Sequence, residues 1–529
     1  MKNRTRIEKI CLSLLLILAI FLAAAPMANA TYDPGNVAVI NDIIDNNGLS
    51  GYNKNDPSNW DFITWDSSAE FIVRLYLDEK DLTGKLDVSG LTNLEYLECY
   101  DNQLTELDVS GLTNLGYLDC GINQLGSLDV TGLINLEGLY CDDNQLTDLA
   151  VSGLTNLARL WCYDNQLTEL DVAGLTNLES LHCYGNQLTD LDLTGLDLVY
   201  LDCGDNQLTD LYVSDQTNLE SLSCYGNQLT DLDLTGLNLV YLDCGDNQLT
   251  DLDLTGLNLV YLNCGDNQLT DLYVSDQTNL EYLYCYGNQL TDLDLTGLNL
   301  VYLHCSDNQL TALDLTGLDL VYLDCGDNQL TDLYVSGQTN LESLYCYGNQ
   351  LTDLDLTGLN LVYLHCSDNQ LTDLDVSDQT NLEILYCYDN QLTTLDLTGL
   401  NNLEILWCYD NQLTESDIIG LGSLNLIEFI LYAPASPSSS GGSGTGSAKI
   451  VDGRQSDSQN HENSQTPIIQ NQPQTDTSEQ AKPQTITEIG TEKEKSSIPV
   501  FVIILAIVAI AAIIGLVGVS TYQKKRNNK

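Results

Sequence analysis

Basic residues are scarce in this chain. Its 529 residues contain 18 Lys and Arg against 76 Asp and Glu, which gives a formal net charge of −58. An acidic field of this size repels phosphate, so nucleic acid is excluded as a partner. Phe and His are also rare, with 5 and 4 residues, but an apolar content of 43% is enough to bury a core and excludes a wholly disordered chain.

Catalytic motifs are missing as well. The sequence has no HExxH, no GxSxG and no phosphate-binding loop, and no nucleophile stands apart from the repeats described below. It also lacks a CxxC pair and a D-x-D-x-D-G calcium loop. Since an enzyme needs one distinctive site, the sequence predicts a protein that is not an enzyme and has no catalytic residues, bound metal or required cofactor.

The two ends carry targeting segments. Residues 1–30 have a basic start, an apolar run and a small-residue cleavage site, which is typical of a secretory signal peptide. Residues 498–519 are uncharged and almost wholly apolar, long enough for a transmembrane helix, and a basic tail follows at 520–529. The positive flank places that tail in the cytoplasm, so the sequence predicts a single-pass cell-membrane protein whose N-terminal part is extracellular.

Composition divides the remainder into three zones. Residues 31–71 are mixed and predict an N-terminal cap with a short amphipathic helix that ends near Gly48. One repeated motif fills 72–432, and 433–497 is rich in Ser, Gly, Thr, Pro and Gln, which predicts a disordered stalk. The apolar face of the cap helix consists of Val37, Ile40, Ile43 and Ile44.

The repeat reads L-x-x-L-x-C-x-x-N-Q-L-T-x-L-D-V/L, and sixteen Cys from Cys99 to Cys408 mark it at steps of 20 or 21 residues. The L-x-x-L-x-C part predicts a strand with Leu and Cys inward, and the Asn three residues after Cys predicts a ladder that satisfies backbone groups of the turn. The return path is too short for a full helix, so we expect a short second strand or an extended turn there.

This motif resembles the short leucine-rich repeat of bacterial proteins, and more loosely the internalin-like surface proteins. The resemblance implies a repeat solenoid, mainly β with little helix, whose parallel sheet lines the concave face. Two rungs without Cys frame the series, with Leu77 and Phe429 in its place, which makes about eighteen rungs. The resemblance also implies a role in adhesion or cell–cell interaction.

The cysteines predict core packing. All sixteen occupy one inward column, and the framing rungs fill that column with Leu77 and Phe429, so Cys acts there as a small buried hydrophobe. Oxidation of some adjacent pairs and metal binding stay open as alternatives.

A column of Asp in the L-D-V/L part stacks like charges at about 5 Å. Asp108, Asp129 and Asp171 are its first members. Two interpretations are open: a solvated acidic face supported by hydrogen bonds, or a row of carboxylates stabilised by Ca²⁺.

Function is expected where the repeats differ from one another. Alternation along each strand turns the residues three before, one before and one after Cys toward the concave face, and these positions are rich in aromatic residues. Tyr and Trp give large contact area at small entropy cost, which favours binding of an extracellular protein or carbohydrate; a ladder that only stabilises the sheet is the alternative. The candidate ligand-binding residues are Tyr96, Tyr117, Trp161, His182, Tyr200, Tyr241, Tyr261, Tyr282, Tyr284, Tyr302, His304, Tyr322, Tyr345, Tyr363, His365, Tyr386 and Trp407.

Taken together, these features predict a membrane-anchored surface protein that binds a partner through its concave face. The alternative is a structural protein of the cell envelope with no external ligand. A block of 61 residues recurs at Asp215, Asp276 and Gly337, and such copying suits an expandable surface in either role.

Overall fold

The computed structural model describes residues 32–431 and 449–450. The predicted signal peptide, transmembrane helix and basic tail lie outside these residues, as does the predicted stalk except for 449–450. Within the described part of the chain, no helix combines the length and the apolar character needed to cross a membrane.

The N-terminal cap covers the first rung. Helix α2 (Pro34–Asn47) begins after Asp33, whose carboxylate accepts a hydrogen bond from the Asn36 backbone N–H at 2.9 Å, and it ends at Gly48 with a left-handed φ of 62°. Its buried face contains Ile40, Ile43 and Ile44, which confirms the predicted amphipathic helix. The cap continues through the short 3-10 helix η1 (Pro57–Asn59) and strand β1 (Ile63–Trp65), which pairs antiparallel with the first rung.

One long sheet contains a strand from every rung. Among the described residues it has 20 strands, of which β1 and β24 (Lys449–Ile450) pair antiparallel and the other eighteen are parallel. This confirms the predicted parallel solenoid. The parallel strands are β2 (Ile72–Tyr76), β4 (Tyr96–Glu98), β6 (Tyr117–Asp119), β7 (Gly138–Tyr140), β8 (Arg159–Trp161), β9 (Ser180–His182), β10 (Tyr200–Asp202), β11 (Ser221–Ser223), β12 (Tyr241–Asp243), β13 (Tyr261–Asn263), β14 (Tyr282–Tyr284), β15 (Tyr302–His304), β16 (Tyr322–Asp324), β17 (Ser343–Tyr345), β18 (Tyr363–His365), β19 (Ile384–Tyr386), β21 (Ile405–Trp407) and β23 (Glu428–Leu431).

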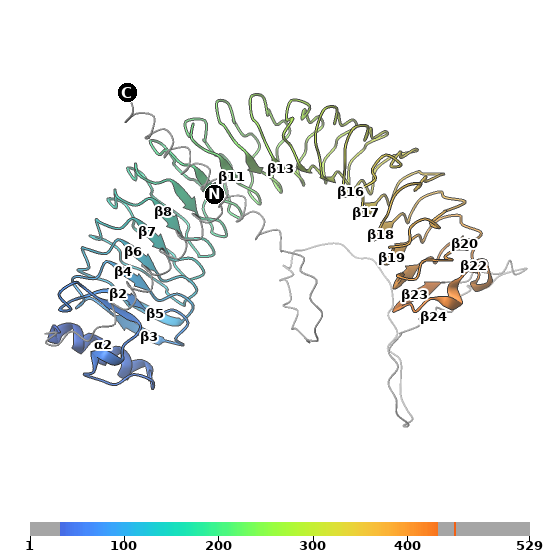
Figure 1. Cartoon of the computed structure of the whole chain (residues 1–529). Coiled ribbons are helices and arrows are strands. Elements are labelled where there is room, and N and C mark those ends of the chain that lie inside the picture. Colours follow the sequence, from blue (N-terminus) through green and yellow to red (C-terminus); the bar gives the residue numbers. More distant parts are fainter. Residues whose placement is uncertain (1–31, 432–448, 451–529) are drawn as a thin grey trace, which may run out of the picture. The chain divides into compact units, whose positions relative to one another are not determined.

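The rungs follow a curved path, with the strands of the long sheet on its inner side (Figure 1). The return segments form strands only at the two ends of the described solenoid, where β3 (Thr83–Asp87) pairs with β5 (Gln103–Asp108) and β20 (Leu395–Asp396) with β22 (Ile418–Ile419). Two short 3-10 helices, η2 (Glu415–Asp417) and η3 (Leu421–Ser423), lie near the last rung. Elsewhere the return is extended chain and turns, so both predicted forms occur.

The core is built from the repeated Leu and Cys columns. All sixteen repeat cysteines are buried and free, and the framing residues Leu77 and Phe429 are exposed by 0% and 5%. Burial raises the pKa of the thiols, in Cys264 to about 12, because the charged thiolate is poorly solvated there. These thiols therefore pack as neutral apolar groups, as predicted.

The Asn ladder connects successive rungs. Asn247 donates from Nδ2 to the carbonyls of Cys224, Cys244 and Gly245 at 3.0 to 3.2 Å, and its Oδ1 accepts from the Leu229 N–H at 3.0 Å. One side chain thus satisfies backbone groups of two rungs, which confirms the role predicted for this position.

Candidate functional site

Two columns of side chains face the concave side of the sheet. In β12 the central Leu242 is buried, whereas Tyr241 and Asp243 on either side of it are partly buried. We call the residues three before and one before each Cys the first and second columns. The parallel register sets Tyr241 beside Tyr261 and Asp243 beside Asn263, so each column stacks rung upon rung.

Aromatic rings form a continuous array from β12 to β21. Neighbouring ring centroids lie 4.0 to 5.7 Å apart, and the closest pair, Tyr302 and Tyr322, is stacked with an interplanar angle of 3°. The chain of rings passes between columns, as from Tyr261 to Tyr284 at 5.4 Å. The members of this C-terminal array are Tyr241, Tyr261, Tyr284, Tyr302, Tyr322, Tyr345, Tyr363, Tyr386 and Trp407.

A second array covers β4 to β9. It consists of Tyr96, Tyr117, Tyr140, Trp161 and His182, with centroids 4.3 to 5.2 Å apart. At its N-terminal end the Arg74 guanidinium lies 5.4 Å from the centroid of the Tyr96 ring, a cation–π contact. The sequence prediction left out Tyr140, although its position one residue before Cys141 identifies it as a concave-face residue.

The structure brings thirteen of the seventeen candidate residues into these two arrays. Tyr200 lies between them, beside Ser221 of β11, and is 38% exposed, while the other sixteen candidates are partly buried. Tyr282 flanks the C-terminal array, 6.4 Å from both Tyr261 and Tyr302. The remaining two candidates are His304 and His365.

These two histidines lie in the second column and stack on a third row, which is formed by the residues just after Cys. His304 stacks on Tyr286 at 4.5 Å and His365 on Tyr347 at 4.6 Å. The Tyr286 ring lies over Gly265, where an added Cβ would come within 2.6 Å of it. A larger residue in place of that glycine would displace the ring. The glycine of one rung therefore leaves the space that the tyrosine ring of the next rung occupies.

Partly or fully buried carboxyl groups lie between the rings in the second column. Burial raises the pKa of Asp119, Asp202, Asp243 and Asp324 to about 6. Asp324 is 6% exposed, and its Oδ2 lies 3.4 Å from Nε2 of His304, whose pKa burial lowers. Burial therefore moves both members of this pair toward their neutral forms.

The same histidine does not form a nucleophilic triad. Its Nε2 contacts both the Ser306 hydroxyl at 2.9 Å and Asp324, whereas a triad needs the nucleophile and the carboxylate on different ring nitrogens. Ser306 is also only 2% exposed. The arrangement fits a packing contact on a binding scaffold.

Two adjoining grooves run beside the N-terminal array. One, of about 490 Å³, is lined by Tyr96, Tyr117, Tyr140, Arg74, Arg159 and by Glu95 and Glu137; the next, of about 540 Å³, is lined by Glu137, Glu179 and several Asn. The grooves share Glu137 and Asn156. The sequence reasoning missed this edge, although Glu recurs four residues before Cys and signals it.

The acidic return column is held by local hydrogen bonds. Asp129 accepts from the Thr131 hydroxyl at 2.6 Å and its N–H at 3.0 Å, and these bonds lower the pKa of the carboxyl group. Among the described residues, no three His, Cys, Asp or Glu side chains are grouped to hold a metal ion. Stabilisation by Ca²⁺ remains a prediction without a site in this part of the chain.

Known proteins share this architecture. The model of the family described as "Leucine Rich repeats (2 copies)" matches residues 92–134, 155–197, 257–299 and 380–423. A functional domain of InlJ from Listeria monocytogenes, described as including a cysteine ladder, has 35% identity and a TM-score of 0.54, covering 60% of this chain and 74% of that one. A comparison with curated proteins gave no match.

Two further solved structures are similar. YopM from Yersinia enterocolitica has 28% identity and a TM-score of 0.50, covering 68% of this chain and 86% of that one. The ectodomain of the plant membrane receptor kinase GASSHO1/SCHENGEN3 from Arabidopsis thaliana has 23% identity and a TM-score of 0.59, covering 72% and 56%. This last likeness shows the fold alone.

Proposed function

Since the chain belongs to the leucine-rich-repeat family and is internalin-like, we propose that it binds a partner protein through its concave face, in adhesion or cell–cell interaction. The observation that carries this proposal is the C-terminal array, nine partly buried rings in contact on one face of a rigid sheet. Rings of this kind supply the anchors of protein interfaces. The plant ectodomain of the same fold was solved in complex with CASPARIAN STRIP INTEGRITY FACTOR 2.

Charge limits the class of partner. Between Lys85 and Lys449 the only basic residue is Arg159, while Glu95, Glu137 and Glu179 border the concave grooves. An acidic partner would be repelled, so the complementary surface is basic or neutral. The Arg74 contact with Tyr96 is an intramolecular example of how a guanidinium group fits these rings.

We also propose that the protein is anchored in the cell membrane with its repeats outside. Composition supports this through the signal peptide at 1–30, the stalk at 433–497, the apolar segment at 498–519 and the basic tail at 520–529. We propose that a stalk of this composition holds the solenoid away from the membrane surface.

The test compares the full-length protein, labelled and kept in mild detergent, with a variant carrying Tyr302→Ser and Tyr322→Ser. Serine occupies the same column naturally at Ser221 and Ser343, so the variant is expected to fold. The probe is a panel of intact bacterial and animal cells, each used untreated and after surface proteolysis. We expect saturable binding that the variant loses and that proteolysis abolishes.

Other outcomes would contradict the proposal in distinct ways. Equal binding by parent and variant would move the site away from the array. Binding that survives proteolysis but is lost in the variant would indicate that the concave face takes a carbohydrate partner. A folded parent that binds no cell in the panel would favour the structural role in the cell envelope.

A further inference from the structure

The return segments carry a row of tyrosines that contribute little to packing. The residue nine positions after each Cys is Asp in most rungs, but in three rungs it is Tyr212, Tyr273 or Tyr334. These side chains are 78%, 78% and 77% exposed, far more than the rings of the concave face. They are 61 residues apart, which corresponds to three rungs. Burial in the fold therefore does not explain them.

An oriented carboxylate accompanies each ring. Leu211 is buried while Asp210 and Tyr212 are exposed, so alternation turns both toward solvent. Thr209 donates a hydrogen bond from its hydroxyl to the Asp210 carboxylate at 3.0 Å. The same bond at 3.0 Å joins Thr270 to Asp271 and Thr331 to Asp332 beside the other two tyrosines.

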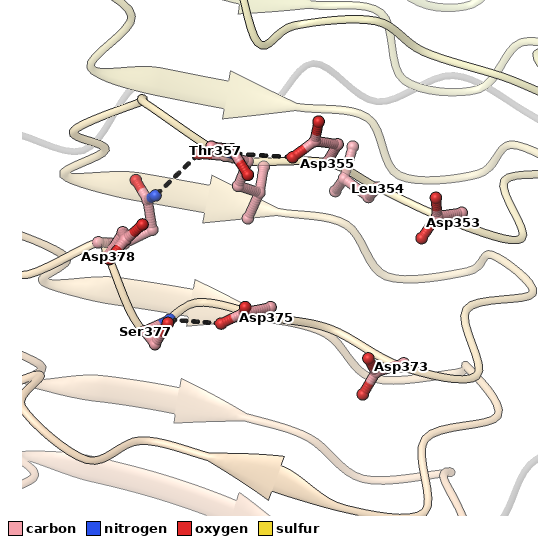
Figure 2. Close-up of a pocket in the computed structure, with 10 residues that line it drawn as sticks. Asp353, Leu354, Asp355, Thr357, Asp373, Asp375, Ser377 and Asp378 are labelled. Carbon is pink, nitrogen blue, oxygen red and sulfur yellow. Dashed lines mark hydrogen bonds between the residues drawn. The ribbon is translucent and has the colours of Figure 1, made fainter.

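A hollow also adjoins the first ring. Tyr212 lines it together with Asp190, Asp192, Thr194 and Ser214, over a volume of about 290 Å³. Figure 2 shows the equivalent hollow eight rungs further along, where Asp375 occupies the place of the tyrosine and Asp355 and Thr357 line the hollow from the preceding rung. The hollow therefore does not depend on the tyrosine, and in the rung of Tyr212 the exposed ring is added to it.

We propose that this tyrosine row binds an uncharged linear polysaccharide. An aromatic ring stacks on the face of a sugar, and oriented carboxylates and hydroxyls accept and donate hydrogen bonds to sugar hydroxyls. The surrounding Asp column repels polyanions, which excludes acidic polysaccharides, nucleic acid and anionic membranes. A second copy of this chain is also excluded as the ligand, because two such acidic columns would repel each other.

The arrangement favours a repeating ligand over a protein surface. Protein hot spots cluster in one desolvated patch, whereas neighbouring rings here are separated by two rungs that have Asp at the same position. Three rungs at about 4.8 Å each put neighbouring rings at least roughly 14 Å apart. A linear polymer can contact all three, and avidity of the order of 10²-fold then arises from individually weak contacts.

The experiment uses the full-length protein in native gels that contain hydroxyethyl cellulose, dextran or, as a polyanion, polygalacturonate. The test variant carries Tyr212→Asp, Tyr273→Asp and Tyr334→Asp, because Asp375 shows that the rung accepts Asp at this position. The matched control is the concave variant with Tyr302→Ser and Tyr322→Ser. Circular dichroism verifies the fold of each protein.

We expect at least one uncharged polymer to retard the parent and the concave variant, and the triple variant to lose affinity by about 10²-fold. Single substitutions should each weaken retardation by a smaller factor. The proposal is overturned if neither uncharged polymer retards the folded parent, if the triple variant is retarded equally, or if polygalacturonate binds as well. It is also overturned if light scattering shows a parent oligomer that the triple variant lacks, since the row would then bind another copy.

Discussion

Replacing one Asn of the ladder by Ala should destabilise the solenoid locally and measurably. Asn247 is 8% exposed and joins three carbonyls and one backbone N–H in two consecutive rungs. Alanine removes all of these bonds. The Cys224 and Cys244 carbonyls keep one donor each, from Nδ2 of Asn227 and of Asn267, and the Gly245 carbonyl keeps the Gly226 N–H, whereas the buried Leu229 N–H loses its acceptor. The variant lacks the two amide hydrogens and the one acceptor of the Asn247 side chain. At 0.5–1.5 kcal/mol for each, we expect the local free energy of unfolding to fall by about 2–4 kcal/mol.

Hydrogen exchange measured by mass spectrometry provides the assay, because a long repeat array does not unfold as a single two-state unit. The Leu229 amide loses its acceptor in Asn247→Ala and should exchange faster by roughly 30-fold or more, as about 2 kcal/mol of local stability implies. Rungs far from the substitution should keep their exchange rates.

The matched control is Asn238→Ala in the same rung. Asn238 is exposed and its Nδ2 donates one bond, to the Thr217 carbonyl at 3.2 Å, so its replacement should cost well under about 1 kcal/mol. If the two variants accelerate exchange equally, or if the Leu229 amide is unaffected by Asn247→Ala, the ladder does not hold the rungs together as argued.

Three further changes test the core and the buried groups. Asp243→Asn should slow hydrogen exchange in its rung relative to the parent at pH 7 and lose this advantage toward pH 4. The folded-state pKa of Asp243 is about 6, above its unfolded value, so ionisation opposes folding as pH rises through that window. Asn263 shows that the column accepts Asn. Gln277→Leu should make the Leu259 amide exchange faster, by an amount worth about 1–3 kcal/mol of local stability, because the Leu259 N–H loses its acceptor and the Leu254 carbonyl keeps only the Leu257 N–H; an unchanged exchange rate refutes this. Ellman's reagent should react with the sixteen buried thiols only in denaturant, and rapid reaction of the folded protein would contradict their burial.

Sequence reasoning recovers most of the fold because each position repeats its role many times. Leu77 and Phe429 identify the Cys column as core, and the invariant Asn identifies the ladder, since no other use of that residue fits every rung. The cap helix follows from spacing and from Gly48. In these cases local preference and packing agree, which is why pattern alone is sufficient.

Other features depend on contacts that spacing cannot supply. Gln277 stands where other rungs have the Leu of G-L-T-N-L. Its hydrogen-bonding role depends on the preceding rung, which is one residue shorter. In the 21-residue rung the Leu94 N–H bonds to Leu91 within its own turn, whereas the Leu259 N–H finds Oε1 of Gln277 in the next rung. The crossing of the ring array from the first to the second column likewise follows from ring packing.

The structure also bears on whether the concave rings stabilise the sheet or bind a partner. The ring pairs are in contact at 4.0 to 5.7 Å, so each ring is held in position by its neighbours when the chain folds, yet all are partly rather than fully buried. Ordering a side chain at an interface otherwise costs about 0.5–1.5 kcal/mol. Because stacking fixes the rings before any partner arrives, the contacts that stabilise the sheet also lower the entropic cost of binding, and the two roles reinforce each other.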